Sequence, residues 1–363
     1  MINTKGSLYP KDALNMLSKI TVKNFRCFRD LKQGGLKRFN FIIGEGGSGK
    51  TALLEAIFLA GGGSPEIYFR IRGWRGFGDI RIVGTRRSFE AIFSDIFFEN
   101  DPSQGAMISL EDSAVGIRTL RIYYSDQEPS TLPLRQTAST APTAISPIHF
   151  KWKIGGREVD TRVFIEENTL KFSASSDVYQ IHFITPQTIA PNVNAQNFSD
   201  LSKRNEQRKI VEAVQKVFPR VRDITTEVIS GDAMLYALMD GISPKLPVAV
   251  LSGAMNKYLS IALAIASAPG GVVLIDEIEN GFYYRDNEKI LTSLAELCED
   301  NNVQLVASTH SWELLTAVAN VFGERWQESL CALRMVRSEN KSAIEYIKGS
   351  AYKSAIAQGF EVR

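Results

Sequence analysis

The sequence lacks the features that mark several large classes of protein. Its three cysteines, Cys27, Cys298 and Cys331, fit neither a metal-binding spacing nor an obvious disulfide, which suits a reducing compartment. No apolar run reaches the length of a transmembrane helix, and the N-terminus has no charged-then-apolar signal pattern. We therefore expect a cytoplasmic protein that has no membrane partner.

The sequence also has little excess charge. Its formal net charge is +2 over 363 residues, so any contact with nucleic acid requires a local basic patch. No internal repeat and no sustained apolar heptad pattern are present, which argues against a repeat protein and against a long coiled-coil arm. With 44% apolar and 23% charged residues, the composition is that of an ordinary globular protein.

One glycine-rich stretch organises the chain. The apolar run 39–43 leads into a segment that fills the pattern G-x-x-x-x-G-K-[ST], namely Gly44, Glu45, Gly46, Gly47, Ser48, Gly49, Lys50 and Thr51. Glycines let backbone N–H groups point at phosphates, and the helix predicted from Lys50 to about Ala60 adds the positive end of its dipole. We expect Lys50 to contact the β- and γ-phosphates of ATP and Thr51 to ligate Mg²⁺.

A second informative stretch, residues 66–87, combines arginines with aromatic residues. The arginines are Arg70, Arg72, Arg75, Arg81, Arg86 and Arg87, and the aromatic residues are Tyr68, Phe69, Trp74 and Phe77. Such a mixture could track a nucleic-acid backbone and stack on bases. The alternatives are a solvated face with a few core rings, or arginines directed at the nucleotide or at a partner protein.

The middle of the chain reads mainly as short strands. Residues 105–125 and 147–186 alternate between apolar and polar, and the segment 127–147, rich in Ser, Thr, Pro and Ala, predicts an exposed loop. Residues 201–217 predict one helix with an apolar face and a solvated charged face. His149 and His182 lie in this region, and we interpret both as structural.

Two further motifs predict the second half of a nucleotide site. Leu251-Ser252-Gly253-Ala254-Met255 precedes an apolar helix, and a buried strand at 272–275 ends in Asp276 and Glu277. Asp276 is placed to hold Mg²⁺, and Glu277 to orient and deprotonate the attacking water. A second buried strand at 303–310 ends in His310, which is placed to hydrogen-bond the γ-phosphate.

Together these pieces resemble the ABC-type ATPases of the SMC and recombination-repair branch. More narrowly, the chain resembles the bacterial AAA-type ATPases related to overcoming-lysogenization-defect (OLD) proteins. The residues that carry the resemblance are Ile20–Phe28, the loop Gly44–Thr51, Leu251-Ser252-Gly253, Leu274–Gly281 and Ser308–Glu313. The similarity frames both ends of the chain and is weak in the middle.

The resemblance implies a head-to-tail dimer with ATP sandwiched between subunits. Each ATP would lie on the phosphate loop of one subunit and beneath Ser252 and Gly253 of the other. Two departures stand out: the signature reads Leu-Ser-Gly-Ala-Met rather than Leu-Ser-Gly-Gly-Gln, and no glutamine-loop residue is convincing among Gln104, Gln127 and Gln180. The chain also ends too soon for the TOPRIM nuclease domain of OLD proteins, so we expect any nuclease to be a partner.

We therefore predict an α/β fold, an ABC-type P-loop ATPase head with a β-rich insertion. The head is predicted to consist of residues 18–63 and 248–363, and the insertion of residues 64–247. The predicted function is ATP hydrolysis coupled to dimerisation and to control of an effector protein in antiphage defence, with ATP and Mg²⁺ as cofactors. The alternatives are a DNA-clamping repair ATPase that uses the Arg70–Arg87 region, and a nucleotide-gated scaffold with little turnover.

Overall fold

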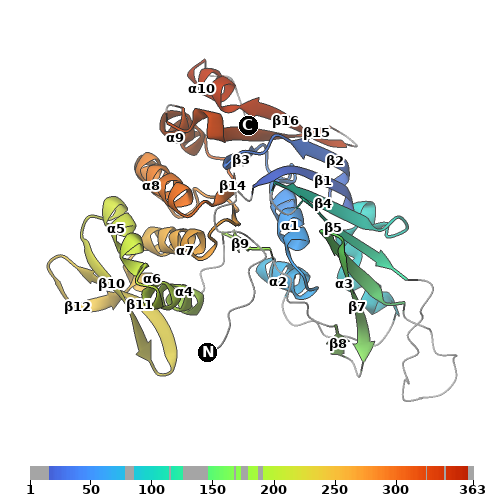
Figure 1. Cartoon of the computed structure of the whole chain (residues 1–363), viewed down its shortest axis with the longest axis horizontal. Coiled ribbons are helices and arrows are strands. Elements are labelled where there is room, and N and C mark those ends of the chain that lie inside the picture. The colour runs from blue at the N-terminus through green and yellow to red at the C-terminus, as the bar shows by residue number, and fades with distance from the viewer. Residues whose placement is uncertain are drawn as a thin grey trace.

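The computed structural model describes residues 16–77, 86–113, 116–125, 146–166, 169–172, 179–186, 191–323, 325–338 and 341–358. These residues form three sheets with helices between and around them (Figure 1). Nearly all of the predicted loop at 127–147 lies outside this described part. Within the described part, no helix has the length and apolar character needed to span a bilayer.

A six-stranded sheet carries the glycine-rich stretch. Its strands run in the order β16–β15–β3–β14–β13–β9, and every neighbouring pair is parallel except β15–β16. β3, β13 and β14 are buried along their whole length, as expected for parallel strands covered on both faces. The strand bounds are β16 Lys341–Lys348, β15 Leu330–Ser338, β3 Phe39–Ile43, β14 Gln304–Ser308, β13 Val272–Ile275 and β9 Ile181–Ile184.

Successive residues of these strands face two different cores, because side chains alternate across a sheet. Phe41 and Val273 pack with the helices α7 to α9, whereas Ile42 and Leu274 pack with α1 and the second sheet. Figure 1 shows α1 between the two sheets and α7 to α9 on the other face of the six-stranded sheet. The helix bounds are α1 Lys50–Gly61, α7 Gly253–Ser267, α8 Asn287–Asp300, α9 Trp312–Phe322 and α10 Gly349–Ala357.

The second sheet has seven antiparallel strands in the order β2–β1–β4–β5–β6–β7–β8. It covers the face of α1 that points away from the six-stranded sheet. The strands are β1 Leu17–Phe25, β2 Phe28–Gly34, β4 Ala106–Asp112, β5 Gly116–Tyr124, β6 Ile148–Ile154, β7 Arg157–Glu166 and β8 Thr169–Lys171. The short helices α2 Glu66–Trp74 and α3 Arg86–Phe93 follow α1 in the chain.

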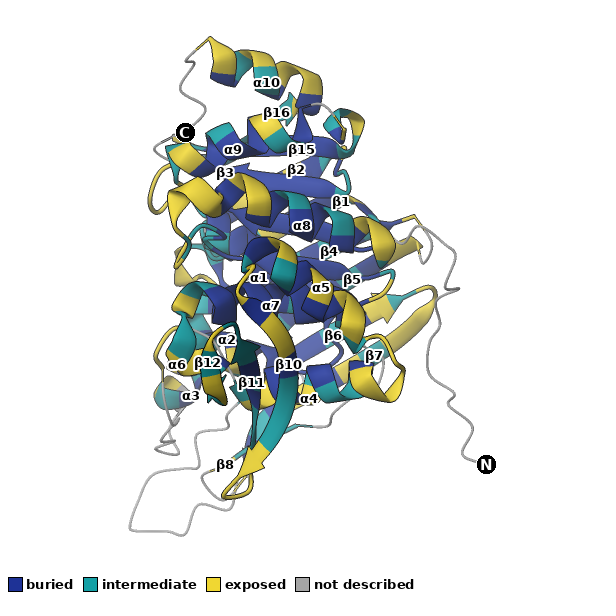
Figure 2. Cartoon of the chain, turned by 90° about the vertical axis from the view of Figure 1, so that its left-hand side faces the viewer, coloured by how far each residue is buried: buried dark blue, intermediate teal, exposed yellow. Residues whose placement is uncertain are grey.

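A third, three-stranded sheet packs beside α4 and α5 at the side of the molecule. Its strands are β10 Val221–Ile229, β11 Asp232–Met239 and β12 Ile242–Pro247, and the adjoining helices are α4 Pro191–Lys203, α5 Gln207–Val217 and α6 Val248–Leu251. Figure 2 shows that α7 is almost entirely buried, whereas the tip of the β10–β11 hairpin is exposed. α5 buries the apolar face that its sequence predicts.

Three sequence-based expectations need correction. The predicted strand 20–28 is a hairpin of β1 and β2 that turns at Arg26 and Cys27, and the predicted helix 201–217 is two helices separated at 204–206. The predicted insertion is not one unit, because β4 to β8 extend the sheet that β1 begins, while β9 pairs with β13 in the six-stranded sheet. Gln180, an unconvincing glutamine-loop candidate in the sequence, precedes β9 and so lies at the amino edge of that sheet, away from the carboxyl ends of the strands.

The end of α1 is held by a buried arginine. Arg118 of β5 donates from its guanidinium to the carbonyls of Ala60 at 2.7 Å and Gly62 at 2.5 Å, where the helix dipole favours a positive charge. We expect Arg118→Leu to lower the free energy of unfolding by about 2–3 kcal/mol, because both carbonyls lose a charged donor. Urea unfolding measures this loss. Arg121→Leu, at an exposed position of the same strand, is the control and should cost less than about 0.5 kcal/mol, so equal losses would contradict the capping role.

Candidate nucleotide-binding site

The glycine-rich loop joins β3 to α1 at the carboxyl edge of the six-stranded sheet. Gly44, Gly47 and Gly49 have φ angles of 143°, 74° and 106°, which side chains rarely tolerate. A Cβ on Gly44 would lie 2.8 Å from the carbonyl oxygen of Met335, and a Cβ on Gly49 would lie 2.8 Å from the Cys27 sulfur. The tight loop therefore requires glycine both for backbone conformation and for space.

The lysine at the end of the loop is held by backbone carbonyl oxygens. The Lys50 ammonium donates to the carbonyl oxygens of Gly44 at 2.6 Å and Glu45 at 2.8 Å. Burial lowers the pKa of Lys50, while the carboxylates of Asp276, Glu277 and Glu279 act in the opposite direction. The ammonium is therefore fixed at the loop by carbonyl oxygens. It also lies in the electrostatic field of the acidic strand end, the residues Asp276 and Glu277 that directly follow β13.

The acidic strand end meets the loop directly. The Thr51 hydroxyl donates to one oxygen of Asp276 at 2.8 Å, although the two residues are 225 positions apart in the chain. The Ser308 hydroxyl, at the end of β14, donates to the other Asp276 oxygen. A hydroxyl and a carboxylate oxygen side by side form the kind of oxygen donor set that Mg²⁺ prefers, so these residues fit the predicted ion.

Glu277 has an unusual backbone conformation for a residue with a side chain. Its φ angle is 48°, in the left-handed region that costs a non-glycine residue on the order of 1 kcal/mol. Its N–H donates to the Ser308 hydroxyl oxygen at 2.9 Å, and its carbonyl accepts from the Lys257 ammonium at 2.7 Å. These contacts hold the strained backbone, and the half-exposed carboxylate is directed into the same space as Lys50.

His310 lies two residues beyond β14 and is held by an acidic neighbour. Its backbone N–H donates to a Glu279 oxygen at 3.0 Å, and its ring Nδ1 lies 3.3 Å from the same oxygen. The ring Nδ1 is also 4.0 Å from a Glu277 oxygen. Because Glu279 takes up Nδ1, the ring can offer its other nitrogen, Nε2, to a ligand.

These residues line one cavity of about 540 Å³, a size typical of small-molecule sites. The structure brings together Gly46, Gly47, Gly49, Lys50, Thr51, Asp276, Glu277 and His310. Gly44 and Glu45 contribute carbonyl oxygens from behind the loop, and Ser48 is buried beneath it. Ser252 and Gly253 do not line this cavity. Ser252 instead caps α7 by accepting from the Met255 N–H at 3.3 Å, and Gly253 is exposed.

Five further residues line this cavity without belonging to the predicted site: Arg26, Cys27, Ala52, Arg75 and Asp95. Arg26 and Cys27 form the turn of the β1–β2 hairpin, which the sequence reads as one strand. Asp95 lies in a short 3₁₀ helix, Ser94–Ile96, with no recognisable motif. Arg75 belongs to the arginine-rich stretch, where a role toward the nucleotide was one of the alternatives.

Three arginines of that stretch have internal partners. Arg75 donates two hydrogen bonds to the buried carboxylate of Glu55, at 2.7 and 2.9 Å. Arg72 donates to the Ile92 carbonyl at 2.7 Å and pairs with Asp95. Arg70 stacks over the rings of Phe58 and Trp74. Arg81 lies outside the described residues. The structure therefore favours a structural role for Arg70 and Arg72, and a cavity-lining role for Arg75.

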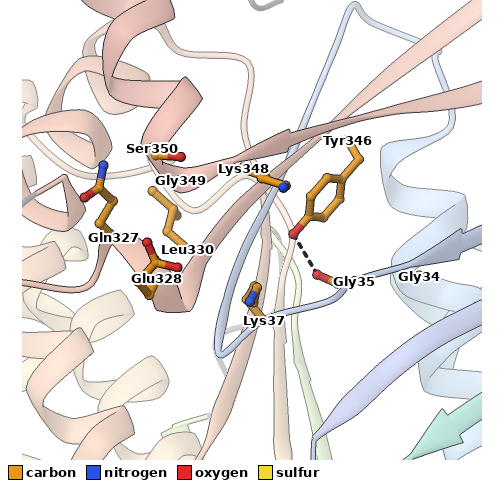
Figure 3. Close-up of a pocket in the computed structure, with 10 residues that line it drawn as sticks. All are labelled: Gly34, Gly35, Lys37, Gln327, Glu328, Leu330, Tyr346, Lys348, Gly349 and Ser350. Carbon is orange, nitrogen blue, oxygen red and sulfur yellow. Dashed lines mark hydrogen bonds between the residues drawn. The ribbon is translucent and has the colours of Figure 1, made fainter.

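A second cavity, of about 440 Å³, lies at the opposite edge of the same sheet (Figure 3). Lys37 precedes β3 and Leu330 begins β15, so this cavity faces the amino ends of the parallel strands. The Tyr346 hydroxyl donates across it to the Gly35 carbonyl at 2.9 Å. Ligands of open α/β sheets bind at the carboxyl edge, so this cavity is separate from the candidate site.

The sequence is similar to two kinds of known protein. A Helicobacter pylori protein named ATP/GTP phosphatase is 23% identical over 341 residues, which cover 85% of this chain and 89% of that protein. The DNA replication and repair protein RecF of Actinobacillus pleuropneumoniae is 51% identical over 47 residues, 13% of each chain.

Solved structures show the same fold. An SMC head bound to the C-terminal winged-helix domain of ScpA has a TM-score of 0.53 at 15% identity, covering 92% of this chain and 97% of that one. An SMC head with an extended coiled coil, bound to the C-terminal domain of ScpA derived from Pyrococcus furiosus, has a TM-score of 0.51 at 12% identity, covering 96% and 100%. The predicted α/β P-loop ATPase head is therefore confirmed.

The family model described as "AAA domain, putative AbiEii toxin, Type IV TA system" matches residues 39–316. The match begins at β3, includes the phosphate loop and the acidic strand end, and continues into α9. Since it spans well over half of the sequence, the chain belongs to this family of AAA-domain proteins, and its fold is similar to that of SMC heads.

Proposed function

We propose that this protein binds ATP with Mg²⁺ in the 540 Å³ cavity and hydrolyses it to ADP and phosphate. The observation that carries the proposal is the 2.8 Å hydrogen bond between Thr51 and Asp276, which joins the phosphate loop to the acidic strand end. The name ATP/GTP phosphatase of the Helicobacter pylori relative gives the same reaction class.

In this mechanism each residue has a distinct task. The backbone N–H groups of the loop and the Lys50 ammonium bind the β- and γ-phosphates, and Thr51 and Asp276 hold Mg²⁺. The ion, when bound, neutralises charge on the phosphate oxygens. Glu277 orients a water molecule and takes its proton as the water oxygen attacks the γ-phosphorus and the bond to the bridging oxygen of ADP breaks. His310 donates a hydrogen bond to the γ-phosphate.

Two arginines add to this proposed site. Arg26 and Arg75 both lie at the cavity wall and share the buried Glu55 carboxylate, which leaves guanidinium N–H groups for a phosphate. The negative charge of Glu55 offsets part of their positive charge. This arrangement suits a polyanionic ligand, because the arginines are held in position before the phosphates arrive.

We also propose that two copies share each nucleotide. Ser252 and Gly253 do not line their own cavity, which supports a role toward the nucleotide of a second copy. The two SMC heads named above are each bound to a domain of ScpA, which supports a protein partner for this head as well. The words "toxin" and "TA system" in the family description support control of an effector in a defence role, by analogy.

The DNA-clamping alternative shares the SMC-type fold and the short similarity to RecF. Fewer arginines are available for the predicted DNA contact, because Arg72 pairs with Asp95 and Arg75 pairs with Glu55. The scaffold alternative differs from the main proposal in turnover alone. Hydrolysis by the wild type that is lost in Glu277→Gln distinguishes these two.

The test of the shared-nucleotide proposal is the mass of the protein in solution. With ATP and Mg²⁺, light scattering is expected to show the wild-type chain shifting from its nucleotide-free mass to about twice that mass. Lys50→Ala should stay at the nucleotide-free mass, because it lacks the ammonium that contacts the phosphates. An identical mass for both proteins under both conditions would contradict closure around shared ATP.

A further inference from the structure

A lysine with no role in the motifs lies buried beside the proposed general base. Lys257 stands one turn into α7 and is 5% exposed. Its ammonium donates to the Glu277 carbonyl oxygen at 2.7 Å and lies 5.8 Å from the centre of the Phe282 ring. Among the described residues, it forms no ion pair with a carboxylate, although buried ammonium groups are usually paired.

The environment of Lys257 makes this arrangement costly. Burial lowers the pKa of Lys257 to about 8, and the carboxylates of Glu279, Glu277 and Asp276 oppose that shift. An aliphatic side chain would fill the same space without the cost of burying a charge. The property that only the lysine supplies is a cationic donor aimed at the Glu277 carbonyl.

That carbonyl belongs to a backbone unit that is held at both ends. The Glu277 N–H donates to the Ser308 hydroxyl oxygen at 2.9 Å, and the carbonyl accepts from Lys257 and from the Asn280 N–H at 3.0 Å. The φ angle of 48° between these two groups places the carboxylate at the cavity. Loss of one anchor allows the strained backbone to relax and the carboxylate to turn away.

We propose that Lys257 is a positioning residue that ties the start of α7 to Glu277 and so sets the direction of the general base. The inference rests on the proposed function, because it takes Glu277 as the base. Ser252 and Gly253 lie at the start of the same helix. A nucleotide held by them in a second copy therefore acts on Glu277 of their own subunit through Lys257.

The test separates turnover from binding. Lys257→Met keeps the volume of the side chain and removes the donor, and we expect kcat to fall about 10- to 100-fold, since a misplacement of about 1 Å costs up to about 10²-fold. The dissociation constant for ATP should stay within about threefold. Lys289→Met is the matched control, because Lys289 also donates to a carbonyl at 2.7 Å, that of Val217, away from the cavity. It should leave kcat unchanged.

Two comparisons make the outcome decisive. In a Glu277→Gln background, Lys257→Met should cause no further loss in single-turnover hydrolysis, because it acts through Glu277. Lys257→Arg should retain more activity than Lys257→Met, whereas a space-filling role predicts that the bulkier guanidinium is worse. Wild-type kcat in Lys257→Met, an equal loss in both backgrounds, or lower activity in Lys257→Arg would overturn the inference. Wild-type kcat in Glu277→Gln would instead overturn the proposed function.

Discussion

Glu277→Gln is expected to lower kcat by about 10²- to 10⁴-fold, the range for loss of a general base, while ATP and Mg²⁺ still bind. The glutamine keeps the size and shape of the side chain but cannot accept the proton of the attacking water. The backbone anchors at Ser308 and Lys257 do not involve the carboxylate, so the left-handed conformation should persist. With hydrolysis blocked, the ATP-dependent dimer should accumulate.

The measurement combines phosphate release with light scattering in ATP and Mg²⁺. Glu328→Gln is the matched control, because it makes the same chemical change at an exposed position by the cavity on the opposite edge of the sheet. It should hydrolyse and assemble like the wild type. If Glu277→Gln matched the wild type in turnover and in mass, Glu277 would not be the base, and a scaffold with little turnover would explain the fold better.

The sequence predicts those parts of the site in which neighbouring residues of the chain form a recognisable motif. The apolar run 39–43, the glycines and Lys50 form one continuous pattern, and so do the apolar strand 272–275 and Asp276. In both cases, a buried strand delivers polar groups to the edge where parallel strands end. Thr51 and Asp276 are 225 positions apart in the chain but in contact in the fold, because β3, β14 and β13 are parallel neighbours in one sheet.

The rest of the site depends on contacts between segments that carry no pattern of their own. Arg26 reaches the cavity because β1 and β2 form a hairpin, and Glu55 is the one acidic residue of the largely buried helix α1. β9 has only four residues, so its alternation cannot show which sheet it joins. Since β9 runs parallel to β13, its carboxyl end lies at the same edge of the sheet as that of β13.

Removing the buried carboxylate of Glu55 is expected to have a large effect on the stability of the fold. Its carboxylate is 3% exposed and contacts two guanidiniums: Arg75 at 2.7 and 2.9 Å, and Arg26 at 2.8 Å. Arg26 is itself 9% exposed, so little water can replace the lost carboxylate. Among the described residues, Glu55→Ala would leave Arg75 with no carboxylate partner and Arg26 with Asp95 alone, at 3.3 Å, and we expect the free energy of unfolding to fall by about 3–5 kcal/mol.

Urea unfolding of Glu55→Ala tests this against Glu212→Ala, which removes the same side chain from a helix. Glu212 pairs with Arg208 at 3.3 Å, but both side chains are largely exposed, so its loss should cost at most about 0.5 kcal/mol. Added salt should reduce the loss of unfolding free energy in Glu212→Ala but not that in Glu55→Ala, because buried ion pairs are poorly screened. Similar losses at the two positions would mean that the arginines are held by other contacts, and that Glu55 does not organise the arginine wall of the cavity.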